Sequence, residues 1–134
     1  MDWMIYGATG YTGKIIAEEA AKRGLKPVLA GRDPQKVKAL ADKLGLPFRA
    51  FDLANIGDGL KGMKAVLHCA GPFSQTSEQM VKACLKAKAH YLDITGEVDV
   101  LDAVYAHDRE AKEAKITLLP GAGFDVVPSD CLAM

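Results

Sequence analysis

Three glycines spaced three residues apart are the residues of this chain best suited to hold a ligand. Gly7, Gly10 and Gly13 follow the apolar run Met4–Tyr6 and lead into Lys14–Arg23, which is rich in helix-forming residues. In such a turn the first glycine lets the backbone leave a strand sharply. The second lets it approach a diphosphate, and the third lets the helix pack against the sheet. Because the helix presents free N–H groups and its positive end to phosphates, the pattern predicts a dinucleotide site.

The context of the glycines strengthens this prediction. Their G-x-x-G-x-x-G spacing is weak evidence by itself and departs by one residue from the commonest fingerprint, but it lies between a predicted strand and a predicted helix. A tight turn that binds nothing is the alternative. Thr9 and Thr12 could contact phosphate through their hydroxyl groups, or one of them could cap the helix. We expect the cofactor to contact this loop through Gly7, Thr9, Gly10, Tyr11, Thr12 and Gly13.

The end of the second predicted strand, Pro27–Gly31, indicates which dinucleotide binds. An acidic side chain there binds the ribose 2′-OH of NAD, whereas NADP-binding domains replace it and offer an arginine to the 2′-phosphate. Here Gly31 takes the acidic position and Arg32 follows, with a planar guanidinium that suits phosphate. Asp33 is better placed to cap the next helix, and Lys36 could add a second positive charge. The sequence favours NADP over NAD, and an exposed loop arginine is the alternative.

The later strands end in further candidates. Asp52 is placed to accept a hydrogen bond from the adenine amino group, with Leu53 beneath the ring, although Asp52 could equally cap a loop. His68 is expected to pack within its strand rather than to act as an acid or base. Ligands of parallel sheets bind across the carboxyl ends of the strands, so the turn that follows Cys69 should border the nicotinamide. This turn consists of Ala70, Gly71, Pro72 and Phe73.

Two carboxylates lie at the end of the next predicted strand. Asp93 and Glu97, with Gly96 between them, could bind or orient a substrate or accept a proton beside the nicotinamide. Alternatively, the two carboxylates cap the following helix. His90 and His107 are expected at the surface. No Ser–His–Asp arrangement and no metal-spaced cluster is present in the sequence, so no metal site is expected and the catalytic residue is left open.

Strands and amphipathic helices alternate along the whole chain, which predicts an α/β fold. Near-continuous apolar strands between such helices indicate a doubly wound parallel sheet, the three-layer Rossmann fold, with strand order 3-2-1-4-5-6. The expected strands after the second are Phe48–Leu53, Ala65–Cys69, Tyr91–Ile94 and Ile116–Leu119. The expected later helices are one that starts at Asp33-Pro34 and ends at Gly45, a loop or single helical turn over Asn55–Gly62, Ser77–Lys88, and Val98–Lys115 with Leu101, Val104, Tyr105 and Ala111 buried.

Composition narrows the function classes. The chain has 134 residues, with 17 basic and 17 acidic side chains, and this balance favours neither nucleic acid nor an anionic membrane as a partner. No apolar run approaches the ~18 residues of a membrane span, and the first strand starts too early for a signal peptide. Cys69, Cys84 and Cys131 are scattered, so we expect free thiols and a cytoplasmic protein.

The end of the chain, residues 120–134, predicts a loop and the start of another helix. A natural domain seldom stops there, so we expect residues 1–134 to be one dinucleotide-binding domain, the N-terminal part of a longer two-domain protein. The apolar side chains at this end would pack under the second domain. Left uncovered, they favour a homodimer. They are Phe124, Val126, Val127, Leu132 and Met134.

Five blocks in order resemble the saccharopine dehydrogenase-like oxidoreductases, in particular the branch that contains the trans-acting enoyl reductases. The blocks are Gly7–Gly13, Ala30–Arg32, His68–Phe73, Tyr91–Glu97 and Gly121–Asp130. The resemblance implies an NADP-dependent enzyme that transfers hydride to or from a small molecule, with a second α/β domain that supplies much of the substrate pocket. It also implies that the glycine loop binds diphosphate, that Arg32 binds the 2′-phosphate, and that the loops at Gly71-Pro72 and Asp93–Glu97 flank the nicotinamide. A binding module that senses NADP(H) without catalysis is the alternative.

Overall fold

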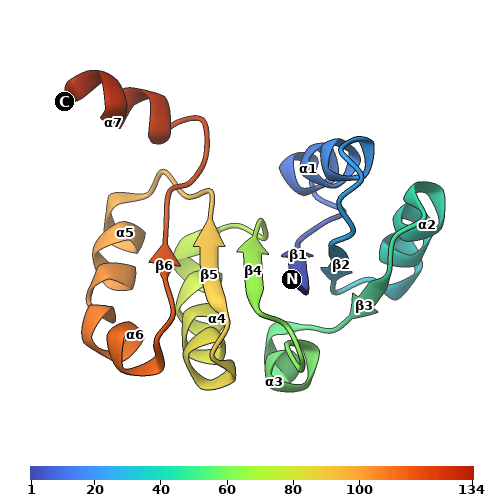
Figure 1. Cartoon of the computed structure of the whole chain (residues 1–134), viewed down its shortest axis with the longest axis horizontal. Helices are drawn as coiled ribbons and strands as arrows, with labels where there is room; N and C mark the ends of the chain where they lie inside the picture. The colour runs from blue at the N-terminus through green and yellow to red at the C-terminus, as the bar shows by residue number, and fades with distance from the viewer.

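The computed structural model describes residues 1–134 and contains one parallel sheet of six strands in the order β3-β2-β1-β4-β5-β6 (Figure 1). The strands are β1 Trp3–Tyr6, β2 Val28–Gly31, β3 Phe48–Ala50, β4 Ala65–His68, β5 His90–Asp93 and β6 Leu118–Leu119. The helices are α1 Tyr11–Lys22, α2 Pro34–Leu44, η1 Leu53–Asn55, α3 Ile56–Gly59, α4 Phe73–Ala87, α5 Val98–Tyr105, α6 Asp108–Ala114 and α7 Val127–Ala133. The predicted doubly wound fold and its strand order are confirmed.

Alternation along the strands divides the core into two layers. Ile5 and Leu29 point to one face, where they pack with the buried residues of α1 and α2. Met4, Val66 and Tyr91 point to the other face, where α3, α4 and α5 supply the partners. Successive strand residues face opposite sides of a sheet, so near-continuous apolar strands bury both faces at once.

The strand order reverses between β1 and β4. Such a reversal leaves a crevice at the carboxyl ends of the two neighbouring strands, where ligands of this fold bind. The backbone after β1 is held on both sides. The N–H groups of Gly7 and Ala8 donate to the Ala30 carbonyl at 2.9 and 3.1 Å, and the Cys69 N–H donates to the Tyr6 carbonyl at 2.8 Å. The first glycine turn is therefore fixed between the loops that follow β2 and β4.

Several predicted boundaries are wrong. Helix α4 starts at Phe73 rather than Ser77, after a cis Gly71–Pro72 peptide. Strand β3 ends at Ala50 because Phe51 turns into the core and Asp52 begins η1. Strand β6 is confined to two residues.

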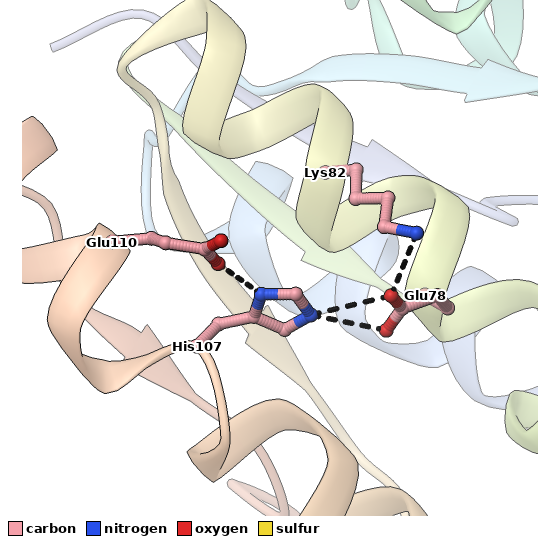
Figure 2. Close-up of polar contacts among 4 residues, drawn as sticks. All are labelled: Glu78, Lys82, His107 and Glu110. Carbon is pink, nitrogen blue, oxygen red and sulfur yellow. Dashed lines mark hydrogen bonds and ion pairs between the residues drawn. The ribbon is translucent and has the colours of Figure 1, made fainter.

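The predicted helix Val98–Lys115 is two helices, α5 and α6, which meet at Ala106 and His107. The His107 ring joins α4 to α6, because its two nitrogens contact Glu78 and Glu110 (Figure 2). It is mostly buried, so its assignment to the surface was wrong. Tyr105, which was expected in the core, is 58% exposed, whereas Val104 beside it is buried.

The last segment leaves the sheet beyond β6, and α7 stands clear of the other helices (Figure 1). A helix at this end agrees with the sequence prediction. Phe124, Leu132 and Met134 are exposed there, whereas Val126 is half-buried beside Gly121. No helix has both the length and the apolar character that crossing a membrane requires.

Candidate functional site

A cleft of about 550 Å³ lies at the carboxyl ends of β1, β2 and β4. It joins three of the predicted segments: the glycine loop, the end of β2 and the turn after β4. Leu53, from the start of η1, also borders it. The predicted cofactor residues that line the cleft are Gly7, Thr9, Gly10, Arg32, Leu53, Ala70, Gly71 and Pro72.

The glycines of the loop are required by close backbone contacts. Gly7 has a positive φ of 84°, and a Cβ there would lie 2.8 Å from the Ala70 nitrogen. A Cβ at Gly13 would lie 2.2 Å from the Gly7 carbonyl oxygen, so the helix start packs directly on the loop. Gly10 is different, because its Cβ would meet only the Gly7 oxygen, at 3.3 Å, and the residue borders the cleft. A side chain at Gly10 would therefore enter the space that a ligand needs.

The start of α1 carries unused hydrogen-bond donors. Gly10 is the N-cap residue, and no side chain caps the helix, so the alternative role of Thr9 or Thr12 as a cap is wrong. The backbone N–H groups of Tyr11, Thr12 and Gly13 make no hydrogen bond within the chain. Free donors at the positive end of a helix are suited to phosphate oxygens. The residues present therefore fit a dinucleotide diphosphate.

The end of β2 carries a cationic side chain and no free carboxylate that could bind a ribose hydroxyl group. Arg32 is exposed, borders the cleft and makes no hydrogen bond or ion pair with the protein. Gly31 is buried, and a Cβ there would lie 3.1 Å from a Val37 methyl carbon, so a longer side chain would displace Val37. Asp33 caps α2 as predicted, accepting from the N–H groups of Gln35 and Lys36 at 3.0 and 3.1 Å.

Asp52 has the capping role that the sequence left open. Its Oδ1 accepts from the backbone N–H and the side-chain amide of Asn55, at 3.1 and 2.8 Å. Its other oxygen makes no hydrogen bond within the chain. Contact between Asp52 and an adenine stays a prediction, as does any ligand contact of the residues beside the cleft that do not line it, Tyr11, Thr12, Gly13 and Phe73.

His68 is a packed residue, as expected. Its side chain is fully buried, and burial lowers the pKa of the imidazole to about 4, so the ring is neutral. Thr76 Oγ1 donates to the Ala70 carbonyl at 2.7 Å, and its contact with His68 Nε2 at 2.9 Å then requires the histidine nitrogen to donate. The histidine holds Thr76, and Thr76 holds the turn after β4.

Five residues that line the cleft were not among the predicted contacts: Tyr6, Gly31, Cys69, Gln75 and Thr76. Gln75 and Thr76 lie in the first turn of α4, which the sequence placed in a loop. The apolar spacing that marked this helix begins only at Ser77, whereas the Gly71-Pro72 pair offered the better start signal. Cys69 is no nucleophile, because burial raises the pKa of its thiol to about 12.

Glu97 is the N-cap residue of α5, but its side chain makes no capping hydrogen bond, and Asp93 lies before the helix start, so capping by the two carboxylates is wrong. Asp93 is fully buried and accepts three hydrogen bonds, from the N–H groups of Thr95 and Gly121 and from the Tyr91 hydroxyl. It joins the loop after β5 to the loop after β6 and has no surface left for a ligand. Glu97 Oε1 instead accepts from the Phe73 N–H at 3.2 Å, at the start of α4.

The doubly wound sheet, the glycine loop and the cleft at the strand ends together define a dinucleotide-binding domain. Residues 3–119 match the family model described as the saccharopine dehydrogenase NADP binding domain, and the chain belongs to this family. It is 29% identical over 95% of its length to the mouse saccharopine dehydrogenase-like oxidoreductase, and 30% identical over 95% to a trans-acting enoyl reductase of Mycobacterium ulcerans. It spans 35% and 33% of the lengths of these relatives.

The fold has a close counterpart among solved structures. Saccharopine dehydrogenase (L-Glu forming) from Saccharomyces cerevisiae superposes with a TM-score of 0.83 over 98% of this chain and 29% of that one, at 18% identity. The family resemblance inferred from the five sequence blocks is thus confirmed. The chain is thus the nicotinamide dinucleotide-binding domain of an oxidoreductase family.

Proposed function

We propose that this chain binds NADP(H) in the strand-end cleft and serves an enzyme that transfers hydride between this cofactor and a small molecule. The proposal rests on two kinds of group that lie near each other and have no partner within the protein: backbone N–H donors and a cationic side chain. The N–H groups at the start of α1 have no protein acceptor, and Arg32 has no protein partner. Family membership supports NADP rather than another anionic ligand.

Each part of the cleft would hold one part of the dinucleotide. The N–H groups of Tyr11, Thr12 and Gly13 would bind the diphosphate, and Gly10 leaves it room. Arg32 would bind the 2′-phosphate with its planar guanidinium. Leu53 and Asp52 would flank the adenine. These assignments follow the order of the strand ends along the cleft.

The nicotinamide would lie toward β4 and β5, beside Gly71 and Pro72. When bound, the cofactor supplies or accepts the hydride. The residues of this chain would hold the nicotinamide ring in position. His68 and Thr76 hold the turn at Ala70, and Glu97 holds the start of α4, so the backbone on this side is fixed before a ligand arrives. Gly96 is exposed on the neighbouring loop and leaves room for a substrate there.

The substrate pocket would be completed by a second domain. The chain spans only about a third of the relatives it matches, and an exposed apolar end follows the last strand. We propose that residues beyond those homologous to this chain cover that end and supply the catalytic acid. The same arrangement in a protein that only senses NADP(H) would bind the cofactor and lack such an acid.

The test is a calorimetric titration of the 134-residue chain with NADP, NADPH and NAD. We expect tighter binding of NADP and NADPH than of NAD, because only the first two carry a group for Arg32. No binding of any dinucleotide would refute the proposal. A metabolite screen of the longer protein, with NADPH oxidation as the readout, would then separate an enzyme from a sensor.

A further inference from the structure

Two buried polar side chains lie next to each other at the centre of the sheet. Tyr6 is the last residue of β1 and His68 is the last residue of β4, and the parallel register pairs the two residues. Their ring centroids are 5.8 Å apart, and both side chains are almost inaccessible to solvent. Because β1 and β4 flank the reversal of the strand order, the pair lies at the crevice where ligands of this fold bind.

Tyr6 is bonded to the adenine side of the cleft. Its hydroxyl donates to the Phe51 carbonyl at 3.2 Å, and its ring packs on the Phe51 ring with centroids 5.1 Å apart. Phe51 comes two residues before Leu53, which borders the cleft. The tyrosine thus holds the stretch of backbone that leads into the proposed adenine contacts.

His68 is bonded to the nicotinamide side of the cleft. Its Nε2–H donates to Thr76 Oγ1 at 2.9 Å, and Thr76 Oγ1 donates to the Ala70 carbonyl at 2.7 Å. The imidazole also packs edge-on against the Phe73 ring, with centroids 5.5 Å apart. The histidine therefore fixes the turn after β4 near both of its ends.

Packing alone does not explain a histidine at position 68. Its Nδ1 is buried and has no hydrogen-bond partner. A buried polar atom without a partner lowers the stability of the fold, and an apolar side chain of similar size would avoid this loss. What the histidine adds is the bond to Thr76, and that bond acts on the wall of the cleft.

We propose that Tyr6 and His68 are positioning residues and that each orders the wall of the cleft for one half of the dinucleotide. Tyr6 orders the wall for the adenine half. His68 acts through Thr76 and orders the wall for the nicotinamide half. A wall that is ordered beforehand loses less entropy when a ligand binds, so its affinity is higher. This inference rests on the proposed cofactor function and adds to it the residues that prepare the site.

The experiment compares Tyr6→Phe with the double variant His68→Leu and Thr76→Val. The double variant removes both partners of the buried bond together with the unsatisfied Nδ1, so its melting temperature should not fall. The ligands are NADPH and 2′,5′-ADP, which contains only the adenine half. Circular dichroism melts, calorimetric titrations and the fluorescence of the reduced nicotinamide are measured for each variant.

The two variants should differ in which ligand they weaken. We expect the double variant to bind NADPH about threefold more weakly, with a smaller change in nicotinamide fluorescence on binding, and to bind 2′,5′-ADP normally. Tyr6→Phe should weaken both ligands about threefold, because both carry the adenine. Thr76→Ser keeps the hydroxyl and should bind NADPH like the unaltered chain. Ser77→Ala is the matched control, since Ser77 is the next residue of α4, is buried and makes no side-chain hydrogen bond to the turn.

The outcomes separate this inference from the proposed function. If the unaltered chain binds no dinucleotide, the proposed function fails. If it binds NADPH and the double variant binds both ligands normally, His68 only fills the core, and the inference is overturned while the proposed function stands. Equal weakening of NADPH and 2′,5′-ADP in the double variant would show a general loosening of the fold and would also overturn it. If the double variant does not fold, Thr76→Val against Thr76→Ser repeats the comparison at one position.

Discussion

At the residue scale, Arg32 shows how side-chain chemistry alone can point to a candidate site. The sequence placed a glycine and then an arginine where an NAD-binding domain would carry a carboxylate. The structure adds the reason that no carboxylate takes that place, because Gly31 is packed against Val37 and Asp33 is used by the helix. The guanidinium is left exposed at the edge of the cleft.

Arg32→Ala should therefore reduce the preference for NADP over NAD by about tenfold or more. The loss corresponds to the ~1.5–3 kcal/mol of a charge-assisted contact. Calorimetric titration with both dinucleotides measures it. Arg23→Ala is the control, since Arg23 is exposed at the far end of α1 and is bonded to Glu19. Equal affinities for the two dinucleotides, unchanged by the substitution of Arg32, would contradict the prediction.

The glycines of the loop should respond differently to substitution. Gly10→Val should abolish dinucleotide binding without unfolding the chain, because the backbone at Gly10 is extended and its side-chain position borders the cleft. Gly13→Ala should instead lower the melting temperature, by about 3–10 °C, because the new methyl group would overlap the Gly7 oxygen. Circular dichroism melts and NADP titrations of both variants test this contrast. Near-normal NADP affinity in Gly10→Val would mean that the loop is only a turn.

Asp93 shows what the sequence could not predict at this scale. It is the last residue of β5, at the carboxyl end of the sheet, where the sequence predicted it. Its hydrogen bond from Gly121 joins residues far apart in the chain, and no local pattern contains that contact. A buried carboxylate with three donors and an exposed one that binds a substrate look the same in a sequence.

At the scale of elements, the number and order of the strands and the ends of α2 followed from the sequence, whereas the start of α4 and the break between α5 and α6 did not. The spacing of apolar residues in a strand or helix reflects which of its faces is buried. This spacing can be recognised within a short stretch of sequence. The break between α5 and α6 lies at Ala106 and His107, and the His107 ring contacts Glu78, which lies 29 residues earlier on α4. The helix pattern of residues 98–115 continues through the break, so the sequence predicted one helix.

The His107 cluster makes the packing of α6 on α4 depend on pH. Glu110 and Glu78 raise the pKa of His107 above its usual 6.5, and a hydrogen bond from Lys82, followed by His107, lowers that of Glu78 below 4.5 (Figure 2). The contribution of His107 is therefore complete below pH 6.5 and is lost as the pH rises through the raised pKa. The contribution of Glu78 is complete above pH 4.5 and is lost in acid.

We expect the stability advantage of the unaltered chain over His107→Gln to be largest between about pH 5 and 6, at roughly 1 kcal/mol or less, because these carboxylates are partly exposed. It should shrink as the pH rises from 6 to 9. Urea unfolding of both chains across this range measures the difference. The control is Gln79→Ala, since Gln79 is exposed on α4 next to Glu78 and carries no ionisable group. A difference that grows with pH would contradict the assignment.

At the scale of the whole molecule, the edge of the sheet that is proposed to bind the cofactor has a formed cleft, whereas the segment beyond β6 exposes apolar side chains. Phe124 and Leu132 are each 87% exposed, and Val127 is about half exposed, on a segment that stands clear of the sheet (Figure 1). Soluble proteins rarely leave clustered apolar side chains uncovered, and such a patch tends to find a partner. The sequence showed that the residues at this end are apolar, but no pattern within a single domain shows what covers them.

The 134-residue chain should accordingly bind NADPH, associate with itself through this end, and turn over nothing. Catalysis needs a second wall that excludes water and places an acid above the nicotinamide. Sedimentation velocity should show a concentration-dependent dimer that Phe124→Asp with Leu132→Asp disperses, while NADP affinity is unchanged because both residues lie outside the cleft. A longer chain with a second domain should be monomeric at this end and gain activity. Substrate-dependent oxidation of NADPH by the 134-residue chain alone would show instead that these residues are a complete enzyme, with its acid among the groups that already border the cleft.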